Sequence, residues 1–199
     1  MDKELTALLQ QPECRVALCQ ALLQSCFSPE IQRSLSEQAE INARAYDYSQ
    51  DLERRAHLHL VQETIEADKY QPAVREQGFR RIVVTSYDHR CALCGVRIVT
   101  SEGHSVVDAA HIIPWRVSHN DDIRNGMALC KMCHWAFDRG MMGVSADYSV
   151  ILSPQIRVEP NFPGLLFTLT ERRIISPTDQ DMWPAQENLL WHRQEFRLP

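Results

Sequence analysis

Long hydrophobic runs are absent from this chain of 199 residues, and their absence excludes a membrane-spanning helix. The first residues, MDKELTALLQQPE, are acidic and amphipathic, so they lack the basic and then apolar order of a signal peptide. We therefore expect a cytoplasmic protein, in which thiols stay reduced. Seven cysteines in that setting favour metal binding and buried thiols over disulfides.

A net positive charge is also missing, because the formal net charge is -5. Residues 1–69 hold 12 acidic and 7 basic side chains, whereas the rest of the chain holds 14 of each. This balance argues against a generally basic nucleic-acid-binding protein. Any affinity for DNA must come from local clusters, such as Arg80-Arg81 and Arg172-Arg173, and from a bound metal, and it should weaken as salt rises.

Internal repeats and low-complexity segments are absent, and the chain is predicted to have two parts. Residues 1–70 predict a helical N-terminal segment, with a break near Pro12 and a new helix start at Ser28-Pro29-Glu30. From there no glycine or proline interrupts the chain until about Asp68. This segment can pack on its own domain, bind a partner protein or pair with a second copy, and self-packing is slightly favoured.

Residues 71–199 predict a mixed domain, so the fold class is α+β, with C-terminal β-hairpins and a terminal helix. Hydrophobic residues make up 44% of the chain, enough to bury a core. The pattern predicts helices over 74–87, 131–139 and 185–196 and strands over 105–112, 127–129, 142–144, 148–152, 165–169 and 173–176.

Four cysteines form two CxxC pairs, Cys91/Cys94 and Cys130/Cys133. Two such pairs from separated segments are typical of one tetrahedral structural zinc. The alternative is four ordinary buried thiols, which rarely repeat CxxC by chance. Cys14, Cys19 and Cys26 do not fit this spacing, and we expect them to be buried thiols.

Polar residues of several chemical types lie between and just after these pairs. His134 and Asp138 are four apart on a predicted helix, so they share a face and can hold one cation. Such a pair alone is more often a surface ion pair. His111 is a candidate general base, because an imidazole has an unperturbed pKa near neutrality and in its neutral form can take a proton from water. Asn125 can hold a loop or orient a ring, although Asn125-Gly126 alone is only a turn signal.

The order DAAHIIPW, then RNG, then LCKMCHWAFDRG resembles the HNH endonucleases of the ββα-metal type. It is most similar to the restriction-type branch that carries an accessory four-cysteine zinc site. The resemblance is strong over residues 76–140. It implies that His111 is the general base, that Asn125 is the central Asn and that His134 ligates a catalytic cation. It also implies a further cation ligand at Asp138 and a structural zinc on Cys91, Cys94, Cys130 and Cys133.

The sequence departs from this family at Ala110, where many relatives have an acid or a second His as a metal ligand. Asp108 lies two residues earlier, and on a strand it shares the face of Ala110. Asp108 can therefore reach the cation in place of the missing ligand, or it can hold a loop. The two interpretations are left open.

The resemblance implies a metal-dependent DNA endonuclease that hydrolyses phosphodiester bonds by a one-metal mechanism, in restriction or defence against foreign DNA. The expected cofactors are a structural Zn²⁺ and a catalytic Mg²⁺ or Mn²⁺, or Ni²⁺, since the last two accept imidazole more readily. One alternative is a zinc-stabilised DNA-binding module without catalytic activity. Another is an interaction protein that acts through its N-terminal helices. A homodimer would most simply explain a cut through both strands.

Overall fold

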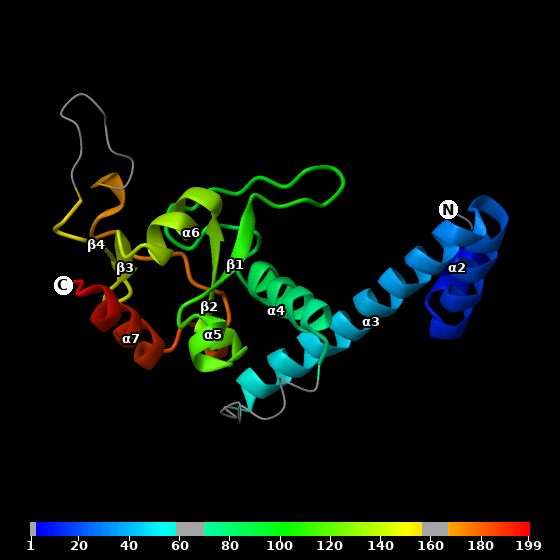
Figure 1. The fold of residues 1–199 in the computed structure, drawn as a ribbon, viewed down its shortest axis with the longest axis horizontal. Coiled ribbons are helices and arrows are strands. Elements are labelled where there is room, and N and C mark those ends of the chain that lie inside the picture. Colours follow the sequence, from blue (N-terminus) through cyan, green and yellow to red (C-terminus); the bar gives the residue numbers. More distant parts are fainter. Residues whose placement is uncertain (1–2, 59–69, 157–166) are drawn as a thin grey trace. The chain divides into compact units, whose positions relative to one another are not determined.

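The computed structural model describes residues 3–58, 70–156 and 167–199 (Figure 1). It confirms the α+β class, with helices at the N-terminus, two small antiparallel hairpins and a C-terminal helix. The chain divides into two compact units, Met1–Arg44 and Ala45–Pro199. No helix in the described ranges is long and apolar enough to cross a membrane.

The N-terminal unit contains α1 (Lys3–Leu9), α2 (Pro12–Cys26) and the first half of α3 (Pro29–His57). The predicted break near Pro12 and helix start at Pro29 are thus confirmed. Between residues 3 and 44 none of the described side chains is buried. Cys19 and Cys26 are exposed and Cys14 is half-buried, so the prediction of buried thiols was wrong. The prediction failed because these helices enclose no core.

The second half of α3 belongs to the C-terminal unit, where it buries one stripe. Ala45, Tyr48, Leu52 and Ala56 are each at most 3% exposed. Their spacing of three or four residues places them on one helix face, which explains why this part of α3 packs. The helix predicted up to Asp68 is confirmed as far as His57, and its remainder lies outside the described residues. The functional division at residue 70 stays a prediction.

The centre of the C-terminal unit is a β-hairpin flanked by helices. Strand β1 (Val107–His111) pairs antiparallel with β2 (Gly126–Cys130), and α6 (Lys131–Asp138) follows directly. Helix α4 (Pro72–Ser86) packs against both strands. The core between them is filled by fully buried apolar side chains, including Val83, Met127, Leu129 and Phe137. This ββα arrangement fixes the ends of β1 and α6, where the candidate site residues lie.

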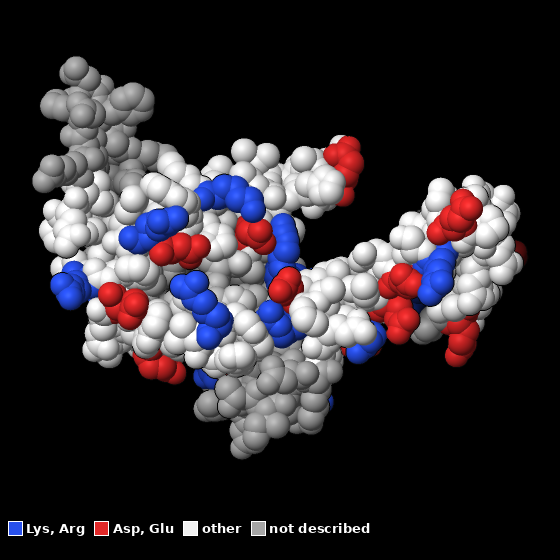
Figure 2. All heavy atoms as spheres, in the orientation of Figure 1, with Lys and Arg blue, Asp and Glu red and all other residues white. Residues whose placement is uncertain are grey.

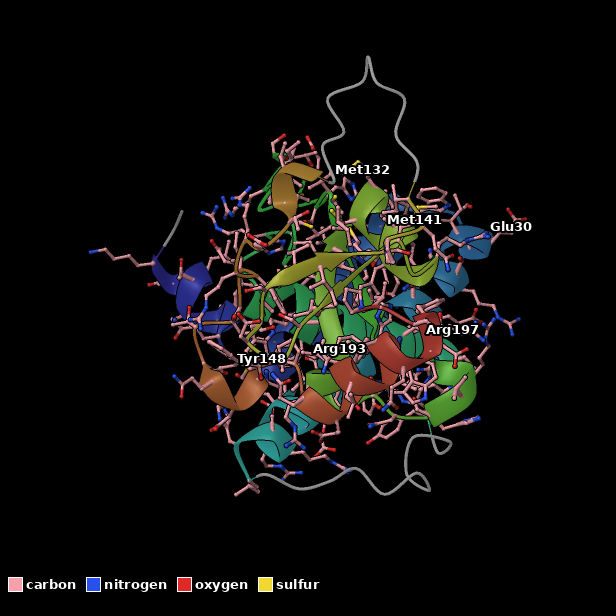
Figure 3. The ribbon with its side chains drawn as sticks, turned by 90° about the vertical axis from the view of Figure 1, so that its left-hand side faces the viewer. Glu30, Met132, Met141, Tyr148, Arg193 and Arg197 are labelled. Carbon is pink, nitrogen blue, oxygen red and sulfur yellow. The ribbon has the colours of Figure 1, made fainter. Side chains whose placement is uncertain are left out.

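A second hairpin, β3 (Met142–Val144) with β4 (Val150–Leu152), follows, and helix α7 (Gln186–Phe196) closes the unit. Arg193 of α7 donates to the Val144 carbonyl of β3 at 2.6 Å, and Figure 3 shows both elements side by side. The strand predicted over 165–169 was wrong for Phe167–Leu169, which form a 3-10 turn, and its first two residues lie outside the described ranges. The strand predicted over 173–176 was wrong as well, because Arg173 makes only an isolated bridge. Glu171 lies between these two segments and has a φ of 64°, which is incompatible with an extended strand.

Candidate active site and metal centres

An open cleft of about 1280 Å³ lies between α4, β1, α6, α7 and the short helix α5 (Trp115–Ser118). Four of the predicted site residues line it: Asp108, His111, His134 and Asp138. They come from the strand and the helix of the ββα unit. The candidate base and the candidate cation ligands therefore face one solvent-filled space.

His111 ends β1, and its ring is held between protein groups. It stacks on Phe79 of α4, with ring centroids 4.0 Å apart and planes only 8° from parallel. Its register partner is Gly126, which has an extended φ of -125° and is not a turn residue. A Cβ at Gly126 would lie 2.9 Å from Phe79 and 2.7 Å from Val83. Glycine is therefore needed here for the close approach of β2 to α4.

Asp121 contacts the His111 ring, and sequence analysis did not identify it. Its Oδ1 lies 2.7 Å from Nε2 of His111, and its side chain is completely buried. Arg75 donates to both carboxylate oxygens at 3.0 Å, and the Tyr48 hydroxyl donates to Oδ2 at 3.1 Å. The guanidinium of Arg75 also stacks on Trp115, 3.6 Å from the ring centroid. His111 is thus linked to a fully satisfied buried carboxylate.

Asn125 is buried and closes the loop between β1 and β2. Its Oδ1 accepts from the Ile113 amide at 2.9 Å, and its Nδ2 donates to the carbonyls of Ile113 and Asn120 at 3.0 Å. The amide side chain therefore replaces backbone partners across the loop. These bonds fit the loop-holding role, and they fix the segment that carries Asp121.

His134 and Asp138 lie on one face of α6, as their spacing predicts. Nε2 of His134 is 3.5 Å from Oδ2 of Asp138, which is too long for a good hydrogen bond. Partial burial raises the pKa of Asp138, and the nearby His134, Arg139 and Arg116 oppose that rise. An imidazole nitrogen and a carboxylate oxygen this close, with the cleft in front of them, fit a divalent cation that completes its shell with water.

Asp108 lines the same cleft but is already paired. Arg80 donates to its Oδ1 at 3.1 Å and Lys131 to its Oδ2 at 3.2 Å. Ala110, the position of the missing family ligand, is buried. In the described ranges, two groups place three or more candidate ligand atoms within 4.8 Å of one another, and neither contains Asp108, His134 or Asp138. The structure therefore brings His134 and Asp138 together and leaves Asp108 in its ion pairs.

The four cysteines lie close together. One pair follows helix α4, and the other spans the end of β2 and the first turn of α6. Their sulfur atoms all lie within 4.8 Å of one another, and Sγ of Cys94 is 3.7 Å from Sγ of Cys130. A tetrahedral zinc with Zn–S bonds of about 2.3 Å separates its sulfurs by roughly 3.8 Å. Cys91, Cys130 and Cys133 are buried. The donor set thus fits one structural metal with no open position.

The thiols of this cluster depend on one another. Hydrogen bonds from Cys133 and Cys94 lower the pKa of Cys91 to about 2. Hydrogen bonding to Cys91 in turn raises the pKa of Cys133 far above its usual range. Without a cation, the cluster therefore favours one thiolate that accepts from its neighbours. A bound divalent metal removes this limit, because it stabilises several thiolates together.

His192 fastens α7 to the helix that carries the candidate cation ligands. Its ring stacks on Phe137 with centroids 3.7 Å apart, and Nε2 donates to the Phe137 carbonyl at 3.0 Å. Burial lowers the pKa of His192 to about 4, so the ring is neutral at pH 7. This neutral, buried ring holds the C-terminal end of α6 in place.

A second group of possible ligands consists of His57, Asp179 and Asp181. Nδ1 of His57 lies 3.5 Å from Asp179 and 3.4 Å from Asp181. All three side chains are 37–43% exposed, which is typical of a solvated ion pair. His57 is more than 120 residues from both aspartates in the chain, so no local spacing signals the contact.

Comparison with known proteins agrees with the ββα site. Residues 91–145 match the sequence profile of a family described as HNH endonuclease. A solved structure titled "Modification dependent TagI restriction endonuclease" is 22% identical, with a TM-score of 0.43. The match covers 59% of this chain and 36% of that one, so it spans about a third of the TagI protein. No curated protein matches this sequence.

Proposed function

We propose that this chain, which contains an HNH endonuclease domain over residues 91–145, hydrolyses phosphodiester bonds in DNA with one catalytic cation. The observation that carries the proposal is the shared cleft. His111 from β1 and the His134–Asp138 pair from α6 line the same open space. A water molecule between them would meet a proton acceptor on one side and a cation site on the other.

His111 acts as the general base in this proposal. Its side chain is 19% exposed and lines the cleft, and its Nε2 contacts Asp121. A neutral imidazole can take a proton from a water molecule within hydrogen-bonding reach. Phe79 and Asp121 together fix the plane and the direction of the ring. Catalysis by this group therefore depends on its deprotonated form.

His134 and Asp138 would hold the cation, which is proposed to be Mg²⁺ or Mn²⁺, or Ni²⁺. When bound, such a cation supplies Lewis-acid stabilisation of charge on the phosphate and the leaving oxygen. The four thiolates of the cysteine cluster would hold zinc, and they leave no position for substrate. Their role is to hold β2 and α6 in fixed positions relative to each other, so that His111 and His134 face the same cleft. Asp108 remains a proposed further ligand, which would first have to leave Arg80 and Lys131.

Basic side chains around the cleft support a DNA substrate. Arg80 and Arg116 line it, and Lys131 begins the helix that carries His134. Figure 2 shows Lys and Arg side chains distributed over the face that carries β1 and α6, with acidic ones between them. Such a mixed surface gives modest, salt-sensitive contacts to phosphates. The proposed biological role is restriction or defence against foreign DNA in the cytoplasm, which rests on the resemblance to the restriction-type branch.

Metal-dependent cutting separates this function from a DNA-binding module without activity. We expect supercoiled plasmid to be nicked or linearised with Mg²⁺, Mn²⁺ or Ni²⁺, and to stay intact when none of these cations is added. His134→Ala should reduce cutting by about 100-fold or more, because the site loses one of its two paired protein ligands. The measurement is gel separation of the plasmid forms over time. Stable binding of plasmid without any cutting in all three metals would favour the inactive module.

We also propose that the N-terminal unit pairs with the same unit of a second copy. Residues 3–44 form helices without a buried side chain, and a unit of only about 40 residues is marginally stable without oligomerisation or another aid. Residues 1–44 hold 6 acidic and 4 basic side chains, so each copy carries a net charge of only -2 and two copies would repel each other weakly. The exposed apolar residues that such pairing would cover are Leu5, Leu8, Val16, Leu18, Leu22, Phe27, Ile31 and Leu35.

The mass in solution tests this pairing. We expect light scattering to give about twice the 23.0 kDa of one chain. Leu22→Glu, which places a charge among the exposed apolar positions, should yield the monomer. Gln20→Glu adds the same charge at a polar position on the same helix and should leave the dimer intact. A wild-type monomer at micromolar concentration would refute the proposal.

A further inference from the structure

Asp121 lies at the centre of a buried polar network that ends at the candidate base. Its carboxylate forms hydrogen bonds with Arg75 from α4, Tyr48 from α3 and His111 from β1, at distances of 2.7–3.1 Å. None of its side-chain surface is exposed. Three elements therefore converge on one side chain from the loop between β1 and β2.

The donors around Asp121 fit a carboxylate that accepts hydrogen bonds on both oxygens. An isolated carboxylate would be strongly disfavoured away from water, but a paired and hydrogen-bonded one is not. Arg75 contacts both oxygens and is itself only 8% exposed. Asp121 acts on His111 by orienting its ring through the contact at 2.7 Å.

An ionised carboxylate only accepts hydrogen bonds, so the short contact determines where the ring proton lies. Nε2 of His111 must carry the hydrogen that Asp121 Oδ1 accepts at 2.7 Å. In the neutral ring this leaves the lone pair on Nδ1. Phe79 lies parallel to the ring and fixes its plane. The contact with Asp121 therefore determines which ring nitrogen of His111 can accept a proton, and the stacking on Phe79 fixes the plane of the ring.

We infer that Asp121 is the positioning residue for the general base, and that Nδ1 of His111 is the atom that takes the proton from water. Tyr48 supports Asp121 from α3, outside the segment that matches the HNH profile. This inference rests on the proposed nuclease function. It concerns the tautomer of His111 as well as the reaction, so one of its tests does not depend on DNA cutting.

The tautomer is read from the ¹⁵N chemical shifts of the histidine rings in the full-length protein, above the pH at which His111 titrates. We expect a single Nε2–H tautomer for His111 in the wild type and a mixture of both tautomers in Asp121→Asn. His192 is the internal control, because its Nε2 faces the Phe137 carbonyl and must carry a hydrogen in both proteins. An Nδ1–H tautomer of His111 in the wild type would overturn the inference, whether or not DNA is cut.

Plasmid cutting gives the second test. Asp121→Asn should lower kcat by about 100-fold, with KM for DNA changed by less than about threefold, because the substitution misdirects a base and removes no DNA contact. Asp121→Glu should recover part of kcat, since it restores the carboxylate. Circular dichroism and zinc content verify that each variant is folded. A folded Asp121→Asn protein that cuts at the wild-type rate would contradict the inference.

Tyrosine variants keep the inference testable if Asp121→Asn does not fold. Tyr48→Phe removes one donor to Asp121 and leaves its ion pair with Arg75 in place. We expect kcat to fall by about three- to tenfold. Tyr87→Phe is the matched control, because the Tyr87 hydroxyl is also buried but has no hydrogen-bond partner in the described part of the chain. Equal kcat values for the two variants would count against the network.

Discussion

His111→Ala is expected to abolish DNA cutting while the protein stays folded and still binds DNA. Removal of a positioned general base costs about 10²- to 10⁴-fold in rate. His111 is partly exposed at the end of β1, where it stacks on Phe79, contacts the Asp121 carboxylate and lies 6.3 Å from the Trp115 ring. The lost packing is therefore small compared with the lost chemistry. The rate of plasmid nicking at saturating cation measures the effect.

A matched histidine shows that the loss is specific. His104→Ala changes an exposed loop histidine that does not line the cleft, and it should cut like the wild type. DNA binding by His111→Ala, measured without added Mg²⁺, Mn²⁺ or Ni²⁺, should stay within about threefold of the wild-type value. Residual cutting above a tenth of the wild-type rate would show that His111 is not the base, and the proposed mechanism would then be wrong.

Loss of the metal proposed for the cysteine cluster is expected to unfold the C-terminal unit of the chain. Structural zinc sites contribute about 10–16 kcal/mol of apparent binding free energy, which exceeds or equals the whole stability of most domains. Cys133→Ala removes a fully buried ligand and leaves three thiols around an incomplete site. We expect the cooperative thermal transition to disappear, together with the zinc, and cutting to be lost even at high Mg²⁺.

Native mass spectrometry and metal analysis provide the check for this prediction. The wild type should carry one zinc per chain, and a strong chelator should remove it together with the thermal transition. Cys19→Ser is the control, because it changes an exposed cysteine in α2 that lies outside the cluster. A Cys133→Ala protein that keeps both its zinc and its thermal transition would refute the structural role.

The parts of the site that sequence predicted are those with short, chemically specific spacing. Two CxxC pairs predict one shared metal site, because each pair places its two sulfurs close together. The structure brings all four sulfurs together. His134 and Asp138 were predicted to share a helix face from their separation of four residues, and they do. In each case a local repeat of the backbone determines the geometry.

The parts that sequence did not reveal depend on contacts between distant elements. Asp121 and Asp122 are neighbours in the same loop, and nothing in the sequence distinguishes them. Asp121 turns inward to Arg75, whereas Asp122 pairs with Arg124 two residues away. Gly126 is similar, since its role is set by a side chain of α4. Burial and long-range packing decide these roles, and neither is encoded in a local pattern.

Helix α3 matters for any attempt to move the proposed catalytic motif into another protein. It runs without interruption from Pro29 to His57, yet only its last turns pack in the C-terminal unit. Tyr48 on those turns braces Asp121 from far upstream of residue 91, where the matched segment begins. Transplanting the motif alone into another scaffold would carry its reactive groups and leave this brace behind. In this protein, the segment that matches the HNH profile and the Tyr48 that supports its candidate base lie in different stretches of the chain.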